Sequence, residues 1–486
     1  MDALVSAVAS DLIGRLISFL VGKYQESSAA DISDTIVRLQ RALLRARVVV
    51  EEAEGRQIAN RAMLQQLSQL RRQLCRAAYA LDAFMWRDDR RSRGTVMSRR
   101  SRSSQTIRLI LPPPSSVDDD VLSVMVESLE AALRNMREFV VLLNGCPRVS
   151  RQPYSAYLFM ESCMFGRQME KEAIVSFLLQ PARDLAVLPI IGPHDVGKRT
   201  LVEHVCLDER VRVRFTEIHR LSSHDLRSPE HHYWSLFDFT ARSLTVIDII
   251  NTDADAEESW RTFHSAILRR RTHGGRGSKI IVIGRTEAHL SLGTVPPLRL
   301  HPPHREELWY FFRALAFGAA DPDDRPDLVP IAMALCERMT VFATFIAANI
   351  IAALLRADLS ACSWRHVLKV ISEITVMHLG AAGNRLDEDK AGRYYLSQPL
   401  KDIPDFPCLV YNRRKLTGMT ESELPKVTIM ELLTGGFLFP PGEKQFDILE
   451  WQSHIPPYTS YVLTCNIDKE VIALTKRLHN KRRRDH

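Results

Sequence analysis

Several features typical of membrane, secreted or zinc-binding proteins are absent from this chain of 486 residues. No apolar run reaches the roughly 18 residues that a membrane-spanning helix needs. No Lys or Arg precedes Arg15, so the N-terminus lacks the basic segment that begins a secretory signal. The eight cysteines form no CxxC pair and no Cys/His spacing of a zinc site, which favours reduced thiols. We therefore expect a cytoplasmic protein, with a nuclear location as the alternative.

Proline and glycine are scarce at the start of the chain, and the first proline is Pro112. Apolar residues there recur in steps of three and four, which predicts helices packed at shallow angles. The pattern predicts a four-helix bundle over residues 1–144, and it contains no cluster of polar residues that would suggest catalysis. The four helical stretches are about 4–20, 32–50, 63–81 and 122–143. A basic, Ser/Arg-rich stretch at 87–120 is predicted to be a mobile loop.

The net charge of +7 arises from two basic runs, at about 87–102 and 476–484. Such runs can bind nucleic acid or act as nuclear addresses. Neither run is interleaved with aromatic residues that could stack on bases. We therefore favour a solvated linker and tail, and we do not expect a nucleic-acid partner.

The most informative stretch is an apolar run, 186–191, that enters the loop Gly192-Pro193-His194-Asp195-Val196-Gly197-Lys198 and continues as a helical pattern. This is the context of a Walker A phosphate loop, in which backbone N–H groups, a helix N-terminus and a lysine bind an anion. The match fails at the next position, because Arg199 stands where a Mg²⁺-binding hydroxyl is required, and Thr200 follows it. A βα turn without a ligand remains the alternative.

Two further apolar runs end in charged residues that suit the same chemistry. The run 243–250 contains Asp248, which fits the metal-binding acid of a Walker B motif or the N-cap of a helix. The run 277–285 ends in Arg285, where a terminal phosphate would lie. Strands alternate with helices here, which predicts a parallel, doubly wound α/β sheet over 160–300 with its ligand site at the carboxyl ends of the strands.

Two regions follow this α/β segment. Residues 301–375 show helical patterns and are expected to form a helical subdomain. The segment 380–486 is predicted to be a small, irregular α+β unit with short strands at 425–430 and 446–451. We assign no chemistry to it.

The order of these motifs resembles the coiled-coil class of plant NLR disease-resistance proteins, from the N-terminus to about residue 370. The stretch 74–84 looks like the third helix of their N-terminal domain, and the later motifs match their NB-ARC core. The resemblance implies an ADP/ATP-controlled switch of innate immunity, whose N-terminal bundle has other NLR proteins or immune signalling proteins as partners. It implies the following cofactor-binding residues: Phe165, Gly166 and Arg167 beside adenine; Gly192, Val196, Gly197, Lys198, Arg199 and Thr200 around the phosphates; Arg285 on the terminal phosphate; and Asp248 on a metal.

The chain also departs from that family. His194 and Asp195 stand where its phosphate loop has glycines, and Ile249 replaces the second acid of its Walker B motif. No leucine-rich repeat follows, so the chain resembles a truncated member. We expect binding of ADP or ATP, a doubtful Mg²⁺ site and impaired hydrolysis. A nucleotide-free scaffold or decoy that acts through the helical bundle is the alternative, and an active ATPase of another kind is less favoured.

Overall fold

The computed structural model describes fourteen segments of the chain, from residue 30 to residue 467: 30–96, 119–147, 164–181, 185–222, 225–226, 242–249, 260–265, 277–285, 292–339, 345–382, 393–396, 409–416, 421–434 and 445–467. The predicted first helix at 4–20 and the basic tail at 476–484 lie outside the described residues. So does most of the stretch 87–120, although its first part continues a helix as far as Val96.

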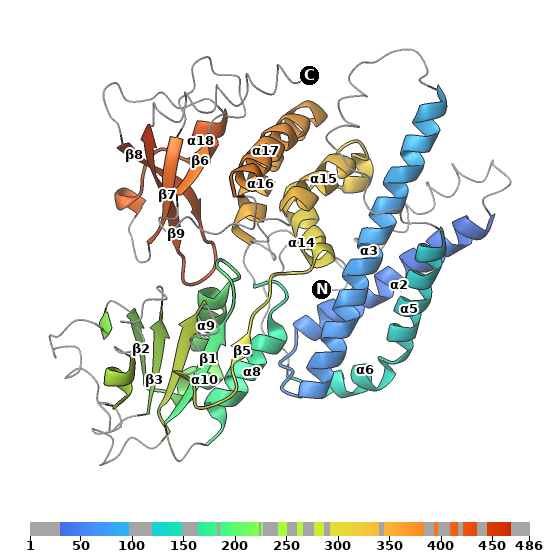
Figure 1. Cartoon of the computed structure of the whole chain (residues 1–486). Helices are drawn as coiled ribbons and strands as arrows, with labels where there is room; N and C mark the ends of the chain where they lie inside the picture. The colour runs from blue at the N-terminus through green and yellow to red at the C-terminus, as the bar shows by residue number, and fades with distance from the viewer. Residues whose placement is uncertain are drawn as a thin grey trace.

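The N-terminal helices form a bundle, as predicted. Helices α2 (Ala30–Glu54), α3 (Arg61–Val96), α5 (Asp119–Arg134) and α6 (Arg137–Asn144) lie together on one side of the molecule (Figure 1). Their apolar stripes meet in one core around Leu39, Leu70 and Leu129, which are fully or almost fully buried.

The prediction of one continuous helix at 122–143 was wrong, because the helix is interrupted at residues 135–136 and α6 starts anew. Leu129, Met136 and Leu143 are nevertheless all buried in the same core. The apolar spacing therefore predicts correctly which side chains face the core, but it does not predict the local break in the helix.

The middle of the chain forms the predicted parallel sheet, with strand order β2-β3-β4-β1-β5. The strands are β1 (Ala186–Ile191), β2 (Glu217–Ser222), β3 (Ser243–Asp248), β4 (Lys279–Gly284) and β5 (Leu298–Arg299). Helices α8 (Gln168–Leu179), α9 (Lys198–Cys206) and α10 (Glu209–Arg214) share a core with one face of the sheet, and Trp260 and Phe263 pack on the other. Both faces are covered, which explains why the inner strands β1, β3 and β4 are largely apolar, whereas the edge strand β2 is more polar and less buried.

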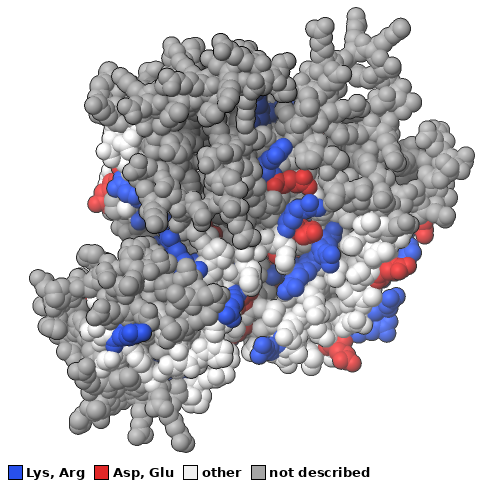
Figure 2. Space-filling view, in the orientation of Figure 1, with Lys and Arg blue, Asp and Glu red and all other residues white. Residues whose placement is uncertain are grey.

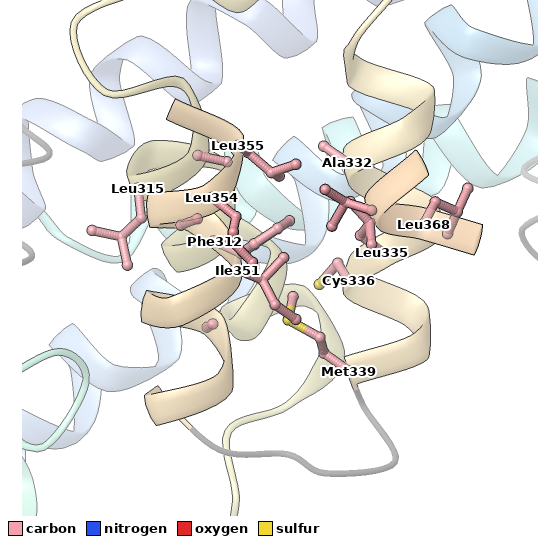
Figure 3. Close-up of a cluster of buried hydrophobic side chains, with 14 of the residues drawn as sticks. Phe312, Leu315, Ala332, Leu335, Cys336, Met339, Ile351, Leu354, Leu355 and Leu368 are labelled. Carbon is pink, nitrogen blue, oxygen red and sulfur yellow. The ribbon is translucent and has the colours of Figure 1, made fainter. Parts of the chain in front are cut away.

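Four helices form the next layer: α14 (Arg305–Phe317), α15 (Val329–Met339), α16 (Phe345–Ala357) and α17 (Ala361–Ala382). Figure 3 shows their shared core, in which Phe312, Leu335 and Ile351 come from three different helices. Tyr79 and Ala83 of α3 join this core, so the N-terminal bundle packs on the helical layer.

The C-terminal part is more regular than predicted. Strands β6 (Arg393–Leu396), β7 (Leu409–Leu416), β8 (Gln445–Gln452) and β9 (Ser460–Ile467) form an antiparallel sheet of order β6-β7-β9-β8 (Figure 1). The predicted strand at 446–451 is confirmed as β8. Ile448, Leu463 and Cys465 enter the same core as α14–α17, so this sheet packs on the helical layer.

The predicted strand at 425–430 was wrong, because helix α18 begins at Ile429 and ends at Thr434. The Thr428 hydroxyl accepts a hydrogen bond from the Glu431 backbone N–H, and the Glu431 carboxylate accepts one from the Thr428 N–H. This reciprocal capping box starts a helix at a residue that the apolar run alone assigned to a strand. Two short 3-10 turns complete the described elements, η3 (Pro322–Asp324) and η4 (Glu421–Glu423).

The cysteines that the structure describes are all free. Burial raises the pKa of the Cys75, Cys206 and Cys465 thiols to about 12, so these thiols are poor nucleophiles. No helix within the described ranges is long and apolar enough to cross a membrane.

Candidate nucleotide-binding site

The phosphate loop connects β1, in the interior of the sheet, to α9. Gly192 directly follows β1 and lies very close to the backbone at Leu300. A Cβ atom at Gly192 would lie 2.4 Å from the Leu300 carbonyl oxygen. Gly197 has φ +91° and starts α9. Asp195 also has a positive φ, 54°, a conformation that Asp tolerates better than most residues. The loop therefore keeps a left-handed turn at a position where its sequence offers no glycine.

Lys198 closes this loop from the inside. Its Nζ donates hydrogen bonds to the Gly192 and Pro193 carbonyl oxygens, each at 2.7 Å. An ammonium has three N–H donors, so one is left for a ligand anion. Burial, together with the positive charges of Arg285 and Lys415, lowers the pKa of Lys198 to about 8. A phosphate placed here would relieve that repulsion.

Asp195 carries the negative charge that opposes phosphate, and the structure compensates it. Its side chain is only 3% exposed. One carboxylate oxygen accepts from Lys415 Nζ at 2.6 Å, and the other lies 2.7 Å from His194 Nδ1. Lys415 lies on β7 of the C-terminal sheet, so a distant part of the chain neutralises the loop. Burial lowers the pKa of Lys415, while Asp195 raises it.

Asp248, the predicted metal ligand, ends β3 and is hydrogen-bonded by Arg199 Nε from the first turn of α9. The position predicted for Mg²⁺ is thus bordered by a guanidinium. Mg²⁺ requires oxygen ligands in a near-octahedral arrangement, and a guanidinium has five N–H donors and no acceptor. The residues present therefore do not fit a divalent cation between the loop and β3. Thr200, whose hydroxyl is one position further along α9, also borders this space.

One pocket joins these groups to the helical layer and the C-terminal sheet. Five cationic side chains and two carboxylates line it, an excess of three positive charges. Its charged lining comes from the phosphate loop, Asp248 and Arg285 at the carboxyl ends of parallel strands β1, β3 and β4. Its apolar lining includes Phe165, Phe311 and Phe345, whose rings pack on one another. A ligand with an anionic end and a flat apolar end fits this distribution.

The tripeptide Phe165–Arg167 links three parts of the molecule. The Phe165 ring lies 5.4 Å from the Phe311 ring. The Gly166 carbonyl accepts a hydrogen bond from Arg71 Nη2 of α3 at 2.8 Å. Arg167 donates to the His301 carbonyl at 2.5 Å and, at 3.4 Å, to the Val196 carbonyl inside the phosphate loop. Arg167 thus holds the loop in place, and Phe165 contributes to the apolar lining of the pocket.

Nine of the eleven candidate residues border this single pocket. The other two, Gly166 and Gly192, shape the backbone next to it. Sequence reasoning missed the contribution of the C-terminal sheet, which brings Lys415, Trp451 and Tyr461 to the pocket. Nothing in the local sequence marked these three residues, because β7, β8 and β9 place them there only through the fold.

Comparison with known proteins supports the N-terminal assignment. Residues 8–109 match the family described as Rx N-terminal domain. The chain is also similar to three disease resistance proteins of Solanum bulbocastanum. It is 24% identical to RGA1 over 384 residues, 26% identical to RGA4 over 273 residues and 24% identical to RGA2 over 356 residues.

The chain is a distant relative of plant disease resistance proteins. The alignments cover 73%, 50% and 67% of this chain, but only 37%, 27% and 35% of RGA1, RGA4 and RGA2. The chain thus spans about a third of the length of these relatives.

Solved structures that match part of the chain include a RuvB mutant of Thermotoga maritima, with a TM-score of 0.29, 18% identity, and coverage of 44% of this chain and 67% of RuvB. The FIGL-1 AAA domain in complex with ADP has a TM-score of 0.29 and 13% identity, and covers 46% of this chain and 86% of that domain. These values are too low to support any inference about the site. The P-loop NTPase-like fold follows from the order of the strands and the loop after β1.

Proposed function

We propose that this protein binds ADP or ATP as a switch or accessory protein of the plant defence response, and that its hydrolysis of nucleotide is impaired. The single observation that supports binding is one pocket that is lined both by a cationic phosphate loop and by a cluster of aromatic rings. The similarity to disease resistance proteins supports the biological setting.

In this proposal, the phosphates lie over the phosphate loop. Backbone N–H groups at the start of α9, the ammonium of Lys198 and the guanidinium of Arg285 would hold them. The base would lie against Phe165 and Phe311, whose rings already pack together. Apolar and aromatic walls with a few charged groups are typical of nucleotide sites.

Impaired hydrolysis is supported by the carboxylates around the pocket. Hydrolysis needs a group that orients or deprotonates the attacking water. Ile249, which occupies the position after Asp248, is buried and has no polar group. The two carboxylates that line the pocket, Asp195 and Asp248, are both held by cations. No further acid among the residues described borders it.

The proposal is tested by calorimetric titration of the folded, full-length protein with ADP and with adenosine. ADP is expected to bind at least about tenfold more tightly than adenosine, because charge-assisted hydrogen bonds to phosphate are strong. Lys198→Ala should lose most of this preference, whereas Lys426→Ala, which removes an exposed lysine, should keep it. Absence of ADP binding to folded protein would reject the proposal.

A second candidate function is a scaffold that works through its N-terminal bundle without nucleotide. It is favoured by apolar side chains exposed on the bundle, namely Val124 on α5 and Val140, Val141 and Leu142 on α6. Partners would be the bundles of other NLR proteins or immune signalling proteins. Figure 2 shows basic and acidic side chains intermingled over the described part of one face, which argues against a nucleic-acid surface there.

The two candidates differ in what Lys198→Ala does to partner binding. A scaffold keeps its partner after this change, while a nucleotide-controlled switch changes its affinity. Val141→Asp, which places a charge on the exposed apolar face, should weaken partner binding in both cases. Partner identity and location in the cell remain predictions.

A further inference from the structure

The geometry points to a metal-independent nucleotide site, in which the guanidinium of Arg199 replaces the divalent cation that accompanies phosphates in P-loop proteins. The expected ligand is a nucleoside diphosphate bound without Mg²⁺. This inference rests on the proposed function, since it concerns the same pocket.

The first observation is the pairing of Arg199 with Asp248. Arg199 is the second residue of α9, where a P-loop protein places the hydroxyl that binds Mg²⁺, and Asp248 is the acid that would assist it. In this chain these two positions bond directly to each other through Nε and Oδ2. The sequence alone showed the loss of a ligand; the structure shows that a cationic side chain occupies its place.

The second observation is the surrounding charge. Lys198, Arg285 and Lys415 lie close enough to influence one another electrostatically. A divalent ion beside Arg199 would add two charges to a site already rich in cations, and its usual carboxylate is engaged. Diphosphate, by contrast, brings negative charge to this cluster and needs no metal to neutralise it.

The third observation is the chemistry of the arginine itself. Its Nε–H donates a hydrogen bond to Asp248, and this bond orients the guanidinium plane. The two Nη groups remain on the same rigid fork and match phosphate oxygens well. Both Arg199 and Asp248 border the pocket together with Lys198, so a phosphate on the loop lies within reach of this fork. Asp248 is then a positioning residue for Arg199.

The experiment measures ADP affinity by calorimetry, with the full-length protein in excess EDTA and in excess Mg²⁺. Wild-type affinity is expected to be no higher in Mg²⁺ than in EDTA, because Mg²⁺ that binds free ADP in solution only withdraws ligand from a site that takes no metal. Arg199→Thr restores the hydroxyl and removes the guanidinium, so its affinity in EDTA should fall about tenfold or more and recover at least partly with Mg²⁺. Arg212→Thr makes the same substitution at an exposed position of α10 and should behave as wild type.

Binding of Mn²⁺ in the presence of ADP, followed by electron paramagnetic resonance, gives a second readout. With the wild type, the spectrum should contain only the free Mn²⁺ ion and the Mn²⁺–ADP complex in solution. With Arg199→Thr, part of the Mn²⁺ should be immobilised on the protein. Should Arg199→Thr fail to fold, Arg199→Lys keeps a positive charge and should still bind ADP in EDTA. Wild-type ADP binding that requires Mg²⁺ overturns this inference alone. Absence of ADP binding in both conditions overturns the proposed function as well.

Discussion

Lys415 and Asp195 lie 220 residues apart in the chain and form an ion pair, with 2.6 Å between Nζ and Oδ1. Asp195 belongs to the phosphate loop and Lys415 to β7, so the pair joins the parallel sheet to the C-terminal sheet directly at the pocket. His194 Nε2 also approaches Lys415 Nζ, at 3.4 Å. The C-terminal sheet therefore belongs to the candidate site, although the sequence offered no chemistry for it.

Replacing Lys415 with methionine should destabilise the fold. The change leaves the almost fully buried carboxylate of Asp195 without its main cation, which typically costs about 3 kcal/mol. The unfolding free energy from denaturant titration measures this. Arg414→Met removes the neighbouring, more exposed ion pair with Asp447 and should cost below about 1 kcal/mol. Equal effects of the two substitutions would show that the pair with Asp195 has no special role.

The pH dependence of ADP affinity should report the state of Lys198. Its pKa of about 8 means that Lys198 is protonated below that pH and loses its charge above it. A bound phosphate favours the ammonium, so affinity is full below about pH 8 and falls as pH rises, by at most about tenfold per unit. Calorimetry in two buffers of different ionisation enthalpy should detect proton uptake on binding above pH 8. An affinity that stays constant through this window contradicts the assignment.

The contribution of Lys198 to the folding stability of the unliganded protein should increase as pH rises, whereas the ADP affinity decreases. The ordinary pKa of 10.5 applies to unfolded Lys198, and the folded value is about 8. Between these values the unfolded chain binds more protons, so the contribution of this group to stability increases with pH. Lys198→Arg stays charged throughout and serves as the control for both profiles, because it should lose this pH dependence. Lys279, with a pKa also lowered to about 8 by burial, adds to the stability profile but lies outside the pocket.

Gly192→Ala should disrupt the phosphate loop. Its Cβ would meet the Leu300 carbonyl oxygen at 2.4 Å, so the backbone after β1 must move. We expect a loss of about 1–3 kcal/mol in unfolding free energy and weaker ADP binding. Gly145→Ala, at the end of α6, meets only an ordinary contact at 3.4 Å and has a negative φ. That control should be neutral or slightly stabilising, and a similar loss in both variants would argue against a special constraint at Gly192.

Asp82 should help to dock the N-terminal bundle on the helical layer. Its carboxylate accepts a hydrogen bond from Trp309 Nε1 at 2.8 Å, and Arg313 lies nearby. Asp82→Ala leaves the buried indole N–H without this acceptor, which typically costs about 1–3 kcal/mol. Amide hydrogen exchange should also increase in α14. Asp34→Ala, an exposed acid on α2, should change neither quantity. Unchanged exchange in Asp82→Ala would show that other contacts hold the N-terminal bundle on the helical layer.

The parts of the fold that could be predicted were those in which one local pattern determines one structure. The apolar runs ending in Gly192, Asp248 and Arg285 predicted parallel strands with their carboxyl ends at one edge, and the pairing of β1, β3 and β4 confirms this. The helical stripes predicted the bundle core in the same way.

The remainder depended on contacts between distant segments. The direct bond of Arg199 to Asp248 and the approach of Lys415 to Asp195 join residues that are far apart in the chain. The run at 425–430 was predicted to be a strand, but the side-chain cap at Thr428 starts helix α18 there. The sequence showed that Arg199 and Asp195 depart from a P-loop pattern, but only the fold showed which partners compensate their charges.

The central claim, that the loop closing on Lys198 binds an adenine nucleotide, is tested most directly by identifying what the purified protein carries. Full-length protein is denatured, and the released small molecules are identified by mass spectrometry, with Lys198→Ala as the matched control. The account predicts ADP or ATP in near-stoichiometric amount from wild type and far less from the variant. Folded wild-type protein that releases no nucleotide, and takes up none when ADP is supplied, would contradict it.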